Sequence, residues 1–172
     1  MSELEWITLV NEHDTILGKE DRVIARKKAL LHRGVGVLVF NSNQELLVHK
    51  RSSEKTVYPN LFDVIVGGSV LWNESYSQAA IRELQEEIGL NCLDLKFLFP
   101  FKYRSIERNL NFEIFTCIMN QKAVLQKEEI KYSLFLNLDQ VIELMKSEGF
   151  CPYAHGIMNE YFKLIHKPLV IE

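Results

Sequence analysis

The sequence predicts an α/β protein in which a mixed β-sheet lies between helices. One supporting observation is the continuous apolar, β-branched segment Gly34–Phe40, which is typical of a strand buried on both faces. Another is that amphipathic helical segments occur in the middle of the chain and near its end, separated by apolar strand-like runs. A chain of 172 residues with 47% hydrophobic and 25% charged residues has ordinary globular composition. We therefore expect one domain over residues 1–172.

Residues 1–30 are expected to form an N-terminal extension, made of a β-hairpin and a short charged helix. Its expected elements, in order, are the strands Glu5–Val10 and Thr15–Leu17 and the helix Lys19–Lys28. Val23 and Ile24 would form the apolar face of that helix. The extension could pack against the core, mediate dimerisation or cover a substrate, and we favour packing or dimerisation.

The remaining strands are predicted from apolar, β-branched runs bounded by turn residues. In order, they are Gly34–Phe40, Glu45–Lys50, Leu61–Val66, Leu93–Tyr103, Leu110–Met119 and Ile130–Leu136. Apolar residues three and four positions apart predict two late helices, Asp139–Ser147 and His155–His166. The inward residues expected for the last helix are Ile157, Met158, Phe162 and Ile165.

The central helix has a clear predicted start and end. Ser75 can cap its N-terminus, and Gln78 three residues later completes a capping-box pattern. Gly89 lies where a left-handed C-cap favours glycine. An apolar stripe facing the core is expected from four residues, Ala80, Ile81, Leu84 and Ile88.

Three acidic residues lie beside this stripe. Glu83, Glu86 and Glu87 are three and four positions apart, so their side chains share one helix face. Like charges at this spacing destabilise a helix by about 0.2–0.5 kcal/mol per pair. A hard divalent cation such as Mg²⁺ would turn this repulsion into binding, because it takes oxygen ligands. A solvated acidic face is the alternative interpretation of an isolated E-x-x-E-E pattern.

The residues around these acids form a longer pattern. Gly68, Glu74, Arg82, Glu83, Leu84, Glu86, Glu87, Gly89 and Leu90 stand at the spacing G-x5-E-x7-R-E-L-x-E-E-x-G-L. This pattern resembles the signature box of the Nudix hydrolase family over the 23 residues from Gly68 to Leu90. The resemblance implies an α/β/α sandwich.

In that resemblance, Glu83, Glu86 and Glu87 hold Mg²⁺ together with the carbonyl of Gly68, and Mn²⁺ is a possible substitute. The resemblance also implies a general base that takes a proton from water, for which Glu86 and Glu129 are the two candidates. Glu129 could instead be a solvated loop acid.

The resemblance further implies a salt bridge between Glu74 and Arg82 that braces the loop against the helix. We assign these two residues a structural role.

Two cations precede the signature pattern. Arg51 and Lys55, followed by Pro59, are similar in spacing to the diphosphate-binding residues of isopentenyl-diphosphate isomerases, a related Nudix branch. We expect them to bind the diphosphate of the substrate, Arg in a bidentate manner and Lys as a point charge. Ordinary surface cations are the alternative interpretation.

The resemblance therefore implies a Mg²⁺-dependent diphosphohydrolase, a pyrophosphatase that cleaves a nucleoside diphosphate linked to another moiety X by attack of water on phosphorus. One alternative is an isomerase of the isopentenyl-diphosphate type, but the segment Asp63–Gly68 lacks the Cys and His that such isomerases need. Another is a non-catalytic nucleotide-sensing domain, although such domains usually lose the box carboxylates.

Composition bounds the expected partners and location. A net charge of −3 gives no general attraction to nucleic acid or to a membrane surface. The expected partner is a small-molecule diphosphate, with a homodimer as a further possibility. Cys92, Cys117 and Cys151 lack metal-like spacing, so we expect reduced and mostly buried thiols. With no secretory or transmembrane pattern in the sequence, a cytoplasmic protein is expected.

Overall fold

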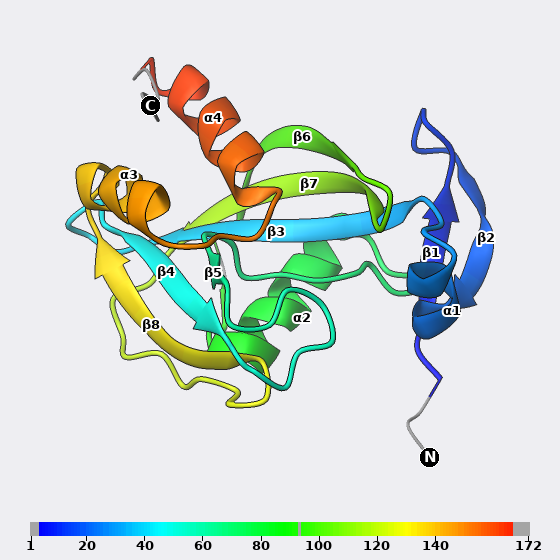
Figure 1. Cartoon of the computed structure of the whole chain (residues 1–172), viewed down its shortest axis with the longest axis horizontal. Coiled ribbons are helices and arrows are strands. Elements are labelled where there is room, and N and C mark those ends of the chain that lie inside the picture. Colours follow the sequence, from blue (N-terminus) through cyan, green and yellow to red (C-terminus); the bar gives the residue numbers. More distant parts are fainter. Residues whose placement is uncertain (1–3, 93, 167–172) are drawn as a thin grey trace.

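The structure, a computed structural model, describes residues 4–92 and 94–166 (Figure 1). These residues form eight strands and four helices. In chain order they are β1 (Trp6–Val10), β2 (Ile16–Asp21), α1 (Arg22–Lys27), β3 (His32–Phe40), β4 (Leu46–Arg51), β5 (Phe62–Asp63), α2 (Tyr76–Ile88), β6 (Lys96–Arg104), β7 (Asn109–Ile118), β8 (Ile130–Leu136), α3 (Leu138–Ser147) and α4 (Ala154–Leu164). The predicted α/β class is confirmed.

Strand β3 is the centre of a mixed sheet. It pairs in parallel with β7 along its whole length, and antiparallel with β1 and β4 near its two ends. Strand β6 adds to β7, β2 adds to β1, and both β5 and β8 add to β4. Because β3 and β4 pair only at Phe40 and Leu46, the two strands diverge beyond their hairpin. The segment that leads to α2 lies along β3 there, with Val37 N donating to Val66 O and Val35 N to Gly68 O.

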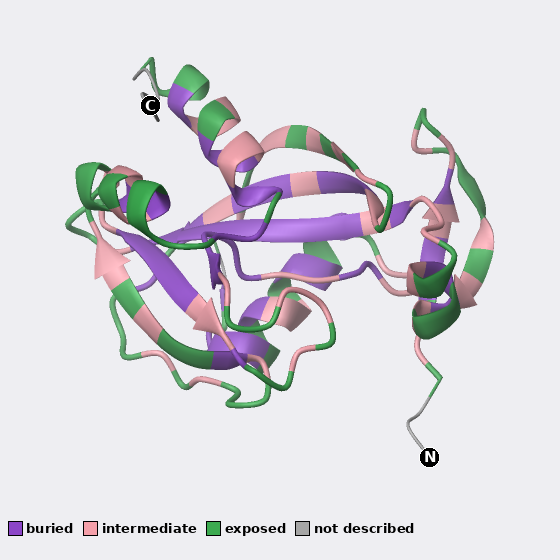
Figure 2. Ribbon diagram, viewed as in Figure 1, coloured by how far each residue is buried: buried purple, intermediate pink, exposed green. Residues whose placement is uncertain are grey.

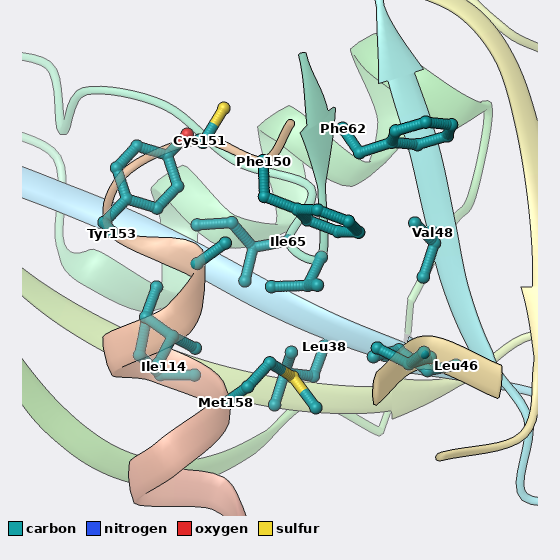
Figure 3. Packing of buried hydrophobic residues seen from close by; sticks show 14 of the residues in the cluster. Leu38, Leu46, Val48, Phe62, Ile65, Ile114, Phe150, Cys151, Tyr153 and Met158 are labelled. Carbon is teal, nitrogen blue, oxygen red and sulfur yellow. The ribbon is translucent and has the colours of Figure 1, made fainter. Parts of the chain in front are cut away.

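Helices cover both faces of this sheet (Figure 1). Alternate residues of β3 point to opposite sides, as expected for a strand with a repeat of two. Leu38 and Phe40 join a core cluster with α3 and α4, whereas Val35, Val37 and Val39 join a second cluster with α2. Figure 2 shows β3 buried over most of its length, with every residue from Gly34 to Phe40 buried, and Figure 3 shows Leu38, Ile114 and Met158 of the first cluster. The predicted burial of this strand on both faces is confirmed.

Both predicted ends of helix α2 are confirmed. Ser75 and Gln78 form a complete capping box, and Gly89 adopts the left-handed conformation with φ 69°. The predicted apolar stripe is wrong at Ile81, which is 42% exposed. The buried face is instead turned toward Tyr76 and Ala79, and it includes Glu87. The consequence is that one of the three clustered acids lies on the buried side of the helix.

The predicted helix of the N-terminal extension begins too early. Residues 19–21 belong to β2, because they pair with β1 in the register Thr8–Lys19, Ile7–Glu20 and Trp6–Asp21. The Asp21 side chain then accepts hydrogen bonds from the N–H groups of Val23 and Ile24, which starts α1.

The predicted apolar face of this helix is also wrong, since Val23 is 68% exposed and Ala25 is the buried residue. The extension nevertheless packs against the core, because β1 pairs with β3 and bridges the segment before α2 at Leu71.

The predicted strand Leu61–Val66 is much shorter, since β5 contains only Phe62 and Asp63. The Asp63 carboxylate accepts hydrogen bonds from Val64 N and Ile65 N, and this local bonding competes with a strand ladder. The residues that follow are buried, as predicted for an apolar segment, but run beside β3 toward Gly68.

The later elements are near their predicted positions. Strand β6 begins at Lys96, and Leu93 lies outside the described residues. Strand β6 continues through Pro100, because it pairs within the described residues with β7 alone and so forms an edge. Ile165 was predicted to point inward but lies after the end of α4 and is 39% exposed. All three cysteines are buried free thiols, as expected. Over the described residues, no helix has the length and apolar character needed to cross a bilayer.

Candidate active site

A cavity of about 220 Å³ lies between α1, the C-terminal half of α2 and the loop after β4. All seven residues predicted for the site line it, namely Arg51, Lys55, Gly68, Glu83, Glu86, Glu87 and Glu129. They come from three separate parts of the chain. Tertiary folding therefore brings together residues whose association the sequence only suggested.

Helix α2 supplies the acidic wall of the cavity. The three carboxylates differ in environment: Glu86 has a half-exposed side chain, Glu83 is mostly covered, and Glu87 is 6% exposed. Gly68 lies directly against this wall, since a Cβ at its position would overlap the Glu83 carboxylate. A glycine at this point therefore lets the loop approach the acids without displacing the Glu83 carboxylate.

The guanidinium of Arg82 organises two of the three acids and the preceding loop. It binds Glu74 (Nε–Oε1 2.9 Å), Glu83 (Nη1–Oε1 2.8 Å) and Glu86 (Nη1–Oε2 3.1 Å), and it also donates to Ser69 O. Glu74 Oε2 in turn accepts from Leu71 N at 3.0 Å. This network attaches the loop to the helix, and the salt bridge expected between Glu74 and Arg82 is present.

Glu87 is the one of the three clustered acids that Arg82 does not bind. Its side chain has no hydrogen bond or ion pair within residues 4–92 and 94–166. Burial, together with the neighbouring charge of Glu83, raises the pKa of Glu87 to about 8. Burial also raises the pKa of Glu83. A cation bound beside this buried acid would lower its pKa again and favour the charged form that binds the cation.

The oxygen atoms available at this site are of the kind that a hard divalent cation prefers as ligands. It consists of carboxylate oxygens together with the carbonyl of Gly68, which already accepts a hydrogen bond from Val35 N at 2.9 Å and retains a second lone pair. In the part of the chain that the structure describes, no three His, Cys, Asp or Glu side chains are grouped closely enough to hold one ion. The three glutamates are not grouped around one point because Arg82 binds Glu83 and Glu86. A metal would compete with that guanidinium for the two acids.

The two cations predicted to bind diphosphate are both partnered within the protein. Arg51 donates to the carbonyls of Tyr58 (3.1 Å) and Val57 (3.0 Å), and its Nη1 lies 3.6 Å from Asp63 Oδ2. It therefore shapes the loop after β4 as well as lining the cavity. Asp63 is fixed in turn by the Tyr153 hydroxyl, which donates to Oδ2 at 2.6 Å.

Lys55 forms an ion pair with Glu129, and both residues line the cavity. Burial and the charge of Arg51 lower the pKa of Lys55 to about 8. The Lys55 side chain is only 21% exposed, so an anion that enters the cavity would meet a largely desolvated ammonium group. Lys55 and Glu129, which were predicted as separate site residues, thus lie next to each other in the cavity.

The cavity is also lined by three cationic residues that the sequence pattern did not indicate. Arg22 and Arg26 come from α1, and Arg108 comes from the turn between β6 and β7. Arg22 is paired with Glu5 at 2.6 Å. Their positions share no spacing or motif, and only the packing of α1 beside the turn between β6 and β7 brings them together at the site.

Comparisons with known proteins agree with this geometry. The NUDIX domain family matches residues 30–150. An uncharacterized Nudix hydrolase of Pseudomonas aeruginosa, PA4841, is 34% identical over 151 residues, which are 88% of this chain and 89% of the relative.

Two solved structures are also similar. DR0079 from Deinococcus radiodurans has a TM-score of 0.80 at 25% identity, covering 91% of this chain and 99% of its own. The NUDIX domain of Shewanella oneidensis NrtR, solved with ADP ribose, shares the fold with a TM-score of 0.62 at 18% identity, covering 85% of this chain and 94% of its own. Because the domain match spans most of the sequence and PA4841 matches along nearly its whole length, the chain belongs to the Nudix hydrolase family, whose members act on phosphoric anhydride bonds.

Proposed function

We propose that this protein is a Mg²⁺-dependent diphosphohydrolase that cleaves a nucleoside diphosphate linked to another moiety X, by attack of water on phosphorus. The observation that carries the proposal is that an acidic cluster and a buried ion pair line the same cavity. Glu87, buried and without a partner among the described residues, lies in this cluster with Glu83 and Glu86. The Lys55–Glu129 ion pair lines the same cavity.

Glu83, Glu86, Glu87 and the Gly68 carbonyl are the groups that would hold the ion, with Mn²⁺ as a substitute. When bound, Mg²⁺ supplies a Lewis acid that offsets the negative charge of a diphosphate. The protein itself supplies Lys55 as a desolvated cation for a phosphate oxygen, and Arg51 as the support of the loop that carries it.

Glu86 and Glu129 are the two candidates for the general base. Glu86 has a side chain that is 52% exposed, so water reaches it, and Arg82 orients it from 3.1 Å. Glu129 is held by Lys55, which keeps its carboxylate next to the site expected for the diphosphate. Glu86→Gln and Glu129→Gln distinguish them, because loss of the base removes the acidic limb of the pH–rate profile.

An isomerase is less well supported. The thiol of Cys151 lies near Asp63, but it is fully buried, and burial together with the Asp63 charge raises its pKa. A protonated, buried thiol is a poor catalyst of proton transfer. A sensing role is the other alternative, and it is distinguished from hydrolysis by the absence of turnover.

The test is a phosphate-release screen with Mg²⁺ and an EDTA control over nucleotide sugars, dinucleotides, ADP-ribose, nucleoside triphosphates and isopentenyl diphosphate. We expect at least one metal-dependent hydrolysis that Glu87→Gln abolishes. Binding of a panel member without turnover would instead favour sensing. A changed isomer ratio of isopentenyl diphosphate would favour the isomerase.

A further inference from the structure

Two guanidinium groups at the cavity stand apart from all of its other cations. Arg26 and Arg108 have no side-chain hydrogen bond or ion pair within the described part of the chain, and the Nε atom of each is buried without a partner. Arg22, Arg51, Lys55 and Arg82 each have a carboxylate or carbonyl partner. A buried N–H group without an acceptor is destabilising, so an acceptor that arrives with a ligand would be favoured.

The two arginines are close enough for their charges to interact. Burial and then the charges of Arg108 and Arg22 together lower the pKa of Arg26 to about 10, with Glu5 acting in the opposite direction. At neutral pH Arg26 still carries its charge. Two like charges held together in a partly desolvated place are stabilised most by an oxyanion that both can contact.

Local structure holds the backbone of both arginines in place before any ligand binds. Ala25, which precedes Arg26, is fully buried and anchors α1. Ser105 Oγ accepts a hydrogen bond from Arg108 N at 2.9 Å, which forms the turn between β6 and β7. Asn109 Nδ2 then donates to Ala29 O at 2.8 Å and ties this turn to the end of α1 (Figure 1). The two arginines therefore come from elements that are fixed to each other.

These arginines also stand between two cavities. They line the cavity that contains Glu83 and Glu87, and they line a second cavity of about 220 Å³ together with Thr56, Val57, Tyr58 and Glu107. A molecule whose diphosphate lies at α2 could therefore extend past both guanidinium groups toward the second cavity.

We propose that Arg26 and Arg108 bind a second phosphate group of the substrate, one carried by the X moiety or by the nucleoside and separate from the diphosphate that is cleaved. The claim that the bound phosphate belongs to the substrate rests on the proposed function. Phosphate binding by Arg26 and Arg108 can be tested without turnover. It narrows the substrate class to diphosphates that carry an additional phosphate ester.

The first test measures binding of inorganic phosphate by calorimetry in EDTA, with no divalent cation present. We expect Arg26→Gln and Arg108→Gln each to weaken binding about tenfold or more, and Arg108→Lys to retain part of it. Lys27→Gln is the matched control, because it removes one charge from an exposed position of the same helix that does not line the cavity. Circular dichroism and thermal unfolding check that each variant folds.

Equal phosphate affinity in Arg26→Gln and wild type, or an equal loss in Lys27→Gln, would overturn the proposal. Glu87→Gln should bind phosphate as well as wild type or better, since it removes an acid from the same cavity.

The second test compares substrates that differ by one phosphate, coenzyme A with dephospho-coenzyme A and ADP-ribose 2′-phosphate with ADP-ribose. We expect kcat/KM of wild type to favour the phosphorylated member of at least one pair by about tenfold, and this ratio to approach one in Arg26→Gln and Arg108→Gln. A ratio near one in wild type for both pairs would overturn the assignment to substrate. A third outcome is that none of the four compounds and no member of the wider panel is hydrolysed, while phosphate binding still depends on Arg26. That outcome would contradict the proposed hydrolase activity but support the phosphate site.

Discussion

The two walls of the cavity are built in opposite ways. The acidic wall is a single stretch of chain, in which Gly68, Glu83, Glu86 and Glu87 are fixed by one loop and one helix. The basic wall is assembled from α1, the loop after β4 and the turn between β6 and β7, which are far apart in sequence. Local helix geometry is sufficient for the first, whereas the second depends on how the N-terminal extension packs.

The walls also differ in how their charges are compensated. On the acidic wall, Arg82 binds Glu83 and Glu86 and leaves Glu87. On the basic wall, Lys55 is paired with Glu129, and among the described residues Arg26 and Arg108 have no acceptor. Each wall thus keeps groups without a protein partner inside one cavity, a buried carboxyl group on the acidic wall and two guanidinium groups on the basic wall. A cation and an oxyanion would therefore bind there at different places.

The largest effect should come from breaking the acidic wall at Glu87. Glu87→Gln removes the carboxylate charge but keeps the shape, and we expect turnover to fall by about 10²–10³-fold because charge stabilisation in the transition state is lost. Steady-state kinetics on the substrate found in the screen measures this. Glu143→Gln, which changes an exposed acid of α3, is the control and should retain full activity. Activity within threefold of wild type in Glu87→Gln would refute the assigned role.

A smaller effect should follow from breaking the basic wall at Lys55. Lys55→Met removes the cation, leaves the Glu129 carboxylate without its partner and should raise KM or lower kcat/KM by about 10–100-fold. The double variant with Glu129→Gln separates the two contributions in a mutant cycle. If the single and double variants lose equal activity and Glu129→Gln alone loses none, Lys55 acts on substrate directly. Unchanged kinetics in Lys55→Met would exclude it from the site.

The third prediction concerns pH and the strand beneath the basic wall. His49 of β4 is 1% exposed, and burial lowers its pKa to about 4, with Asp63 acting in the opposite direction and Arg51 and Lys55 in the same direction. The unfolded chain therefore binds more protons than the folded one between about pH 6.5 and pH 4. The His49 contribution to stability is complete above pH 6.5 and is lost as pH falls through this window.

At pH 5 the expected loss from His49 is about 2 kcal/mol of unfolding free energy. His32 has its pKa lowered to about 4 in the same way, so the pH dependence contains both residues. Urea unfolding of His49→Gln at pH 7.5 and pH 5 should show a shallower pH dependence by about that amount. His155→Gln on α4 is the control. An identical pH slope in His49→Gln and wild type would contradict the prediction.

The smallest effect is expected from the support of Arg51. Tyr153→Phe removes the hydroxyl that donates to the buried Asp63, and we expect a loss of about 1.5 kcal/mol of stability. Because Asp63 lies against Arg51 and Arg51 holds the loop that carries Lys55, KM should rise while kcat changes less. Chemical denaturation and kinetics on the same preparation measure both. A stability loss with unchanged KM would limit Tyr153 to a structural role.

Sequence patterns predicted well where local physics decides the outcome. The capping box at Ser75, the left-handed Gly89 and the shared face of the three glutamates all follow from helix geometry within one stretch. The buried strand β3 follows from its apolar composition alone. Predictions were wrong where a tertiary contact competes with a local pattern, as at residues 19–21, which pair with β1, and at Asp63, whose side chain ends β5.

The family pattern, the α/β class and the acidic cluster of α2 can be read from the sequence, because each depends on residues close together in the chain. The burial of Glu87, the binding of Arg51 to carbonyl groups and the meeting of Arg26 and Arg108 at the cavity are known from the three-dimensional structure alone. The physical reason is that burial and charge pairing are set by neighbours in space. Residues 26 and 108 become neighbours only when the end of α1 is bonded to the β6–β7 turn.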